Sequence, residues 1–87
     1  MTFYVYLLIS NKNNKKLSYV GYTKNLQKRL ILHNSSKGAK FTKGRKWKLA
    51  YYKTYDNKIL AMKEEYKLKK NLKLRNSIKE RYIQKLR

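Results

Sequence analysis

Several residue types are absent or scarce in this 87-residue chain, and each scarcity excludes a class of protein. There is no cysteine, which excludes disulfide bonds and thiolate zinc sites as aids to folding. The one histidine, His33, cannot form a histidine cluster by itself. Proline is absent and the three glycines are scattered, so no segment resembles a linker between domains. We therefore expect a single small domain over residues 1–87.

Acidic residues are also scarce, because only 4 Asp and Glu stand against 24 Lys and Arg, for a formal net charge of +20. A compact body with this charge repels itself unless a polyanion, above all nucleic acid, neutralises it. The hydrophobic content of 41% and aromatic content of 14% exclude a disordered basic tail. The longest apolar run is too short for a membrane span, and the first lysine follows that run instead of preceding it, unlike in a signal peptide. We expect a cytoplasmic protein.

Hydrophobic patterning predicts an α/β protein of the α+β type, in which helices flank a small, three-stranded, mainly antiparallel sheet. The predicted order is strand, strand, helix, strand, helix, helix. The strands are expected at residues 3–9, 17–22 and 47–55, with a turn at 10–16 and a mobile loop at 35–46. The helices are expected at 24–34, 58 to about 72, and 78–86. Their predicted N-terminal caps are Thr23, Asp56 or Asn57, and a capping box of Ser77 with Glu80.

The apolar faces of these elements contain one unusual residue. The third strand is expected to present Trp47, Leu49, Tyr51 and Tyr55 on one face, and the second helix to bury Leu60, Ala61, Leu68 and Leu72. On the first helix, Arg29 and His33 share a face with two leucines. An arginine on an apolar face requires a buried partner or an anionic ligand.

The short inventory of reactive residues excludes most enzyme classes. No glycine-rich nucleotide-binding motif is present, and a catalytic triad would have to pair His33 with Asp56, the only aspartate, in a chain with no suitable serine. No carboxylate precedes Asp56, which argues against a site with two metal ions, because such sites need several converging carboxylates. A single Mg²⁺, by contrast, needs only one carboxylate together with water and substrate phosphate oxygens. Asp56 and Glu80 are expected in helix caps, so Glu64 and Glu65 remain as candidate metal ligands. Helical periodicity does not distinguish between these two.

One ordered set of residues distinguishes hydrolysis of nucleic acid from simple binding. Tyr4-Val5-Tyr6 is followed by Tyr19-Val20-Gly21, then by Arg29 with His33 four residues later, then by Glu65. The chain resembles the GIY-YIG nuclease domain over about residues 3–75. Tyr4 stands in place of the family's first glycine, and valine replaces isoleucine in both tripeptides. Residues 37–45 are similar to a loop of the small stand-alone bacterial members, and the family register selects Glu65 over Glu64. For a late asparagine found in some branches, Asn71 and Asn76 are both candidates.

The resemblance implies a catalytic set whose members have separate tasks. The set is Tyr6, Tyr19, Arg29, His33 and Glu65. Glu65 would bind Mg²⁺ or Mn²⁺, and Arg29 would hold the scissile phosphate. Tyr19 is expected to deprotonate the attacking water and Tyr6 to position it, although these two roles can be exchanged. His33 is expected to position water or phosphate. Gly21 is expected where the backbone passes close to the site or takes a positive φ.

The basic residues of the loop and of the second helix predict a nucleic-acid interface. Its expected members are Lys40, Lys43, Arg45, Lys46, Lys48 and Lys69, with Phe41 and Trp47 among them. The favoured function is a metal-dependent endonuclease that hydrolyses DNA, including branched DNA, or RNA, with a partner protein supplying specificity. The alternatives are a nucleic-acid-binding module that does not cleave and, more distantly, a ribosome-associated basic protein. The sequence leaves the oligomeric state open.

Overall fold

The computed structural model describes residues 1–12 and 15–85, and within these the predicted order of elements is confirmed. The strands are β1 (Phe3–Lys12), β2 (Lys15–Thr23) and β3 (Lys48–Tyr55), in the sheet order β2-β1-β3 with both pairings antiparallel. The helices are α1 (Leu26–Asn34), α2 (Lys58–Lys70) and α3 (Leu72–Lys85), with a short 3₁₀ helix at Lys40–Thr42. The structure is therefore an α+β fold, as expected.

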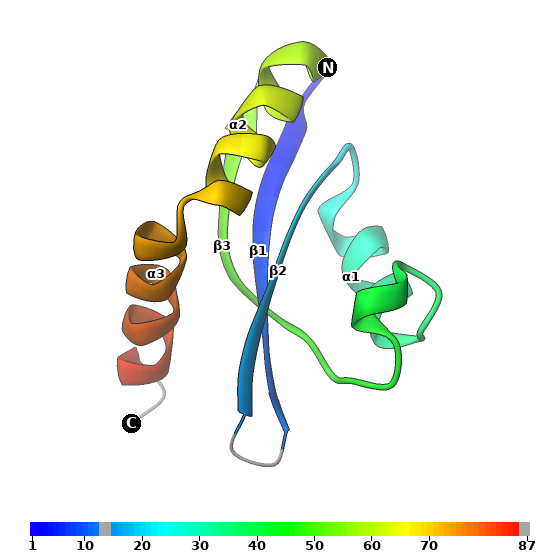
Figure 1. Ribbon diagram of the computed structural model, residues 1–87. Coiled ribbons are helices and arrows are strands. Elements are labelled where there is room, and N and C mark those ends of the chain that lie inside the picture. Colours follow the sequence, from blue (N-terminus) through cyan, green and yellow to red (C-terminus); the bar gives the residue numbers. More distant parts are fainter. Residues whose placement is uncertain (13–14, 86–87) are drawn as a thin grey trace.

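Helices cover the sheet on both faces, which explains why β1 is apolar or aromatic at every position from Phe3 to Ile9 instead of alternating (Figure 1). Phe3, Val5 and Leu7 pack with buried residues of α2 and α3. Tyr6 and Leu8 point to the opposite face, where they pack with Trp47 and with Leu26 and Leu30 of α1. The central strand thus sends alternate side chains into two separate cores, one on each face of the sheet.

The predicted single face of the third strand is wrong because β3 contains an irregularity. Leu7 of β1 pairs with Tyr51, but Leu8 pairs with Leu49, so Ala50 is an extra residue in the register. An extra residue of this kind transfers the following side chains to the other face of the sheet. Leu49 accordingly packs with Tyr6 and Leu8, whereas Tyr51 and Tyr55 pack against the core beneath α2 and α3.

The predicted ends of α1 and α2 are partly correct. Asn25, and not Thr23, caps α1, with its side-chain oxygen accepting a hydrogen bond from the Lys28 amide at 3.0 Å. Thr23 still belongs to β2 and contacts the Asn25 amide through its hydroxyl group. At α2, Asn57 is the cap, which resolves the choice between it and Asp56.

The largest difference between the predicted and the observed elements concerns α3, which begins at Leu72, well before the predicted start. Asn71 ends α2 and also caps α3, where its side chain accepts from the Leu74 amide at 3.0 Å. The predicted capping box of Ser77 and Glu80 therefore lies inside a continuous helix. Of the predicted stripe on α2, Ala61 and Leu68 are buried, whereas Leu60 and Leu72 are exposed. The predicted helix end at Leu86 lies outside the described residues.

Two connecting segments also differ from the sequence-based expectation. Most of the predicted turn at residues 10–16 belongs to the strands, which extend to Lys12 and from Lys15, and residues 13–14 lie outside the described part of the chain. The predicted loop at 35–46 contains the 3₁₀ helix. Asn34 holds the end of this loop, since its side chain donates to the Trp47 carbonyl at 3.0 Å and accepts from the Trp47 amide. Within the described residues, no helix is both long enough and apolar enough to cross a bilayer.

Candidate active site

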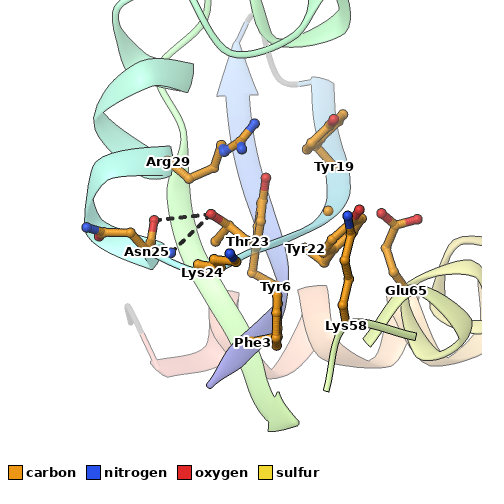
Figure 2. A pocket seen from close by; sticks show the side chains of 11 residues that line it. Phe3, Tyr6, Tyr19, Tyr22, Thr23, Lys24, Asn25, Arg29, Lys58 and Glu65 are labelled. Atoms are coloured by element: carbon orange, nitrogen blue, oxygen red, sulfur yellow. Dashed lines mark hydrogen bonds between the residues drawn. The ribbon is translucent and has the colours of Figure 1, made fainter. Parts of the chain in front are cut away.

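A cleft of about 510 Å³ crosses the edge strand β2 and collects side chains from both faces of the sheet. Four of the five predicted catalytic residues line it, each from a different element: Tyr6 from β1, Tyr19 from β2, Arg29 from α1 and Glu65 from α2. Figure 2 shows these four side chains around one common space. Residues far apart in the chain are therefore gathered at one hollow that is open to solvent.

The strand register explains how the two tyrosines and Gly21 come together. Tyr6 lies opposite Gly21, and Tyr19 lies opposite Leu8, so both tyrosines project from the same face of the sheet with ring centroids 6.5 Å apart. A Cβ atom at Gly21 would collide with the Tyr6 hydroxyl oxygen and lie only 2.6 Å from Cζ of that ring. The prediction that the backbone passes close to the site at Gly21 is confirmed.

His33 does not line the cleft but lies behind Tyr6 in a buried chain of hydrogen bonds. Its Nε2 atom is 2.9 Å from the Tyr6 hydroxyl oxygen, and its Nδ1 atom is 2.9 Å from the Thr42 hydroxyl oxygen. The three side chains are at most 2% exposed. The imidazole ring also lies against Tyr19, with centroids 4.9 Å apart. His33 thus contacts both tyrosines, while only the tyrosines reach the cleft surface.

Burial sets the protonation state of this pair. Removal from water raises the pKa of the Tyr6 hydroxyl far above its ordinary value of 10.0, with a further rise from Tyr19, an opposing effect of Arg29, and a smaller rise from Glu65. Burial lowers the pKa of His33 below its ordinary value of 6.5, and the positive charge of Arg29 lowers it further. At neutral pH the pair therefore consists of a neutral phenol and a neutral imidazole.

The two neighbouring glutamates of α2 lie in different hollows. Glu65 lines the cleft with Tyr6 and Arg29, and its Oε1 atom is 3.2 Å from the ammonium group of Lys69. Glu64 lines a separate hollow beside Val5 and Tyr55 and pairs with Lys67 at 3.6 Å. The structure separates the two carboxylates, which helical periodicity alone did not.

Neither candidate for the late asparagine lines the cleft. Asn71 caps α3 and lines the hollow that contains Glu64, and Asn76 is exposed on α3. The family position therefore has no counterpart among the residues that form this cleft.

Positive charge dominates the cleft wall. Arg29 is joined by Lys24 and Lys58, whereas Glu65 is the one carboxylate among the lining residues. Sequence analysis assigned no role to either lysine, because Lys24 was placed in a helix that in fact begins later and Lys58 was noted only as the start of a helix. Three cations around one carboxylate suit an anionic ligand such as a phosphodiester.

The predicted nucleic-acid residues lie in several different surroundings. Lys40 and Lys43 are exposed at the 3₁₀ helix, beside Phe41, whose half-exposed ring stacks on Tyr19 at 6.2 Å. Lys46 and Lys48 line a different hollow with Tyr82 of α3. Arg45 is partly buried, and its Nη1 atom has no hydrogen-bond partner among the described residues. Lys69 is paired with Glu65.

The donor set fits a divalent cation that takes most of its ligands from substrate and water. Among the described residues, no group of three or more His, Cys, Asp and Glu side chains could hold a metal ion. Glu65 nevertheless offers a carboxylate whose side chain is 16% exposed and lines the cleft. Mg²⁺ is commonly held by one or two carboxylates together with phosphate oxygens and water, so this arrangement is compatible with it.

Two residues near His33 were not found by sequence analysis. A Cβ atom at Gly38 would lie 2.8 Å from both Cγ and Cε1 of the imidazole, so the loop backbone packs directly against the ring. Thr42, the other missed residue, contacts the ring through its hydroxyl group. No periodicity or motif within the loop pointed to these contacts, because they join the loop to a side chain of α1.

Comparisons with known proteins show the family of this chain. The model of the GIY-YIG catalytic domain matches residues 2–84. A UPF0213 protein of Oceanobacillus iheyensis is 45% identical over 67 residues, which cover 76% of this chain and 74% of the relative. A UPF0213 protein of Bacillus velezensis is 40% identical over 85 residues, or 97% of this chain and 80% of the relative. The solution NMR structure of a UPF0213 protein from Bacillus halodurans matches at 37% identity and a TM-score of 0.43, over 79% of this chain and 71% of that one.

Proposed function

Because this chain belongs to the GIY-YIG family, a family of nucleases, we propose that it is a divalent-metal-dependent endonuclease that hydrolyses phosphodiester bonds in DNA. The observation that supports this proposal best is the meeting of Tyr6, Tyr19, Arg29 and Glu65 around one cleft. These residues are separated by up to 59 positions in the chain and come from four elements, yet all of them line this one space.

Glu65 would hold Mg²⁺ or Mn²⁺. The positive charge of the ion would neutralise the negative charge of the phosphate and of the leaving oxygen. Arg29 would bind the non-bridging oxygens of the scissile phosphate, and its planar guanidinium would stabilise the charge that grows in the transition state. Lys24 and Lys58, which line the same cleft, would bind the flanking phosphates. Phe41, exposed beside Tyr19, offers a face on which a base can stack.

The geometry supports exchanging the two tyrosine roles that the sequence suggested. Tyr6 is the phenol bonded to a neutral imidazole, whereas Tyr19 contacts the same imidazole through its ring. As water attacks phosphorus, it would transfer a proton to the Tyr6 oxygen while the Tyr6 proton moves to Nε2 of His33. This relay ends with a neutral phenol and an imidazolium, so Tyr6 need not ionise in spite of its raised pKa. Tyr19 would position the water.

Plasmid nicking with Mg²⁺, Mn²⁺ or EDTA tests the proposal, with Glu65→Gln and Arg29→Ala as the site variants. Both variants should lose metal-dependent cleavage. Glu64→Gln is the matched control, because this neighbouring carboxylate faces another hollow, and it should cleave like the unmodified protein. If Glu65→Gln cleaved normally, the assigned metal site would be wrong.

The same assay distinguishes the alternative function. Binding without metal-dependent cleavage of duplex DNA, branched DNA or RNA would instead identify a nucleic-acid-binding module that keeps the fold. The pairing of Glu65 with Lys69 is the feature that favours this alternative, because it already neutralises the one carboxylate of the cleft.

A further inference from the structure

The buried chain behind the cleft ends on Thr42, a side chain that does not reach the cleft. The Tyr6 hydroxyl oxygen is 2.9 Å from Nε2 of His33, and Nδ1 of the same ring is 2.9 Å from the Thr42 hydroxyl oxygen. Thr42 and His33 are, at 0% and 1% exposure, closed to solvent. The partners that the protein supplies therefore decide which ring nitrogen carries the hydrogen.

The remaining contacts of Thr42 settle that choice. Its hydroxyl oxygen is also 3.0 Å from the carbonyl oxygen of Ala39 and 3.2 Å from the amide nitrogen of Ala39. A carbonyl oxygen only accepts and an amide N–H only donates, while a hydroxyl group carries a single hydrogen. All three contacts are made when the hydroxyl donates to the carbonyl and accepts from Nδ1–H of His33. Nε2 then carries a lone pair and accepts from the Tyr6 hydroxyl.

We propose that Thr42 is a positioning residue that holds His33 in the Nδ1–H tautomer, so that Nε2 is the acceptor for the proton of Tyr6. The catalytic meaning of this assignment rests on the proposed nuclease function. In the opposite tautomer Nε2–H would donate to Tyr6, and the imidazole could not accept a proton from the phenol. Thr42 thus sets the direction of the relay without touching substrate.

The loop supplies a second constraint on the same ring. The Gly38 backbone packs so closely on the imidazole that it leaves no room for a Cβ atom. Gly38 therefore fixes where the ring lies, and Thr42 fixes where its hydrogen lies. Both residues flank Lys40, so the loop that presents basic side chains to solvent also shapes the proton acceptor beneath it.

The imidazole nitrogens report the tautomer directly, because His33 is the only histidine of the chain. Uniformly ¹⁵N-labelled protein without a histidine tag would be measured by long-range ¹H–¹⁵N correlation, at a pH about one unit above the ordinary histidine pKa of about 6.5. We expect a protonated Nδ1 and an unprotonated Nε2 in the unmodified protein and in Thr42→Ser, which keeps the hydroxyl group. Thr42→Val has a similar shape without the hydroxyl, and should shift the population toward Nε2–H.

Two results would overturn the proposal: an Nε2–H ring in the unmodified protein, or an unchanged Nδ1–H ring in Thr42→Val. The first decides the matter even if Thr42→Val fails to fold. In cleavage assays kcat should fall about 10- to 100-fold in Thr42→Val, the range found for partners that orient metal-binding imidazoles, with Thr42→Ser restoring it and DNA binding unchanged. Failure of the unmodified protein to cleave would refute the nuclease proposal alone, since the tautomer is measured without substrate.

Discussion

Replacing Gly21 with alanine tests the closest approach in the cleft. The added Cβ atom would collide with the hydroxyl group of Tyr6 and lie 2.6 Å from Cζ, and Tyr6 is buried and cannot move freely. Overpacking of this kind costs about 1–3 kcal/mol. Alanine recovers about 0.5–1 kcal/mol relative to glycine inside a strand. We therefore expect a net loss of up to about 2.5 kcal/mol in the free energy of unfolding.

The same collision would push the phenol away from His33. The rate of cleavage should therefore fall by more than the loss in the free energy of unfolding accounts for. Urea unfolding gives the stability, and plasmid nicking gives the activity. Ile78→Val is the matched control, because it removes one methylene from the core on the opposite face of the sheet at a cost of about 0.5–1.5 kcal/mol. This control should cleave normally. A Gly21→Ala protein with unchanged stability and activity would refute the close approach.

Three further predictions concern His33, Asn34 and the loop lysines. Because the pKa of His33 is lowered in the folded state, the free energy of unfolding should fall as the pH drops through the ordinary value of 6.5, where the unfolded chain takes up the proton first. Cleavage should decline at still lower pH, where the folded ring is protonated, and a flat pH–rate profile would contradict the relay. Asn34→Ala removes two hydrogen bonds to the main chain of Trp47 and should lower the free energy of unfolding by about 1–3 kcal/mol. Urea unfolding monitored by the fluorescence of this single tryptophan measures the change. Replacing Lys40 and Lys43 with glutamine should reduce the slope of log K against log salt by about 0.9 for each phosphate that the protein no longer neutralises, and an unchanged slope would exclude them from the interface.

The sequence predicted the helices and strands well where the signal lies in a few neighbouring residues. The apolar run of β1 and a helix cap at Asp56 or Asn57 are local signals; both are present in the structure, where Asn57 is the cap. The start of α3 was missed because Asn71 serves two helices at once, with no glycine or proline to mark the break. The face change in β3 was missed because the extra residue at Ala50 is defined only by its pairing with β1.

For the cleft, too, the sequence indicated some of the residues, and only the tertiary structure shows the others. Family spacing pointed to Glu65, but only packing of α2 on the sheet places Glu64 and Glu65 in different hollows. Gly38 and Thr42 act on a ring that belongs to another element, and such contacts depend on tertiary structure that a single sequence does not display. Sequence reasoning therefore found the groups that line the cleft better than the groups that support them.

The central position of β1 has a consequence for local unfolding. Its amides should exchange with heavy water most slowly, because this strand is paired on both edges and covered on both faces. The outer side of α2, by contrast, leaves Ile59, Met62 and Tyr66 in solvent. Detachment of α2 would carry Glu65 away from Tyr6 while the sheet persists, so hydrolysis should stop at a lower denaturant concentration than the one that melts β1.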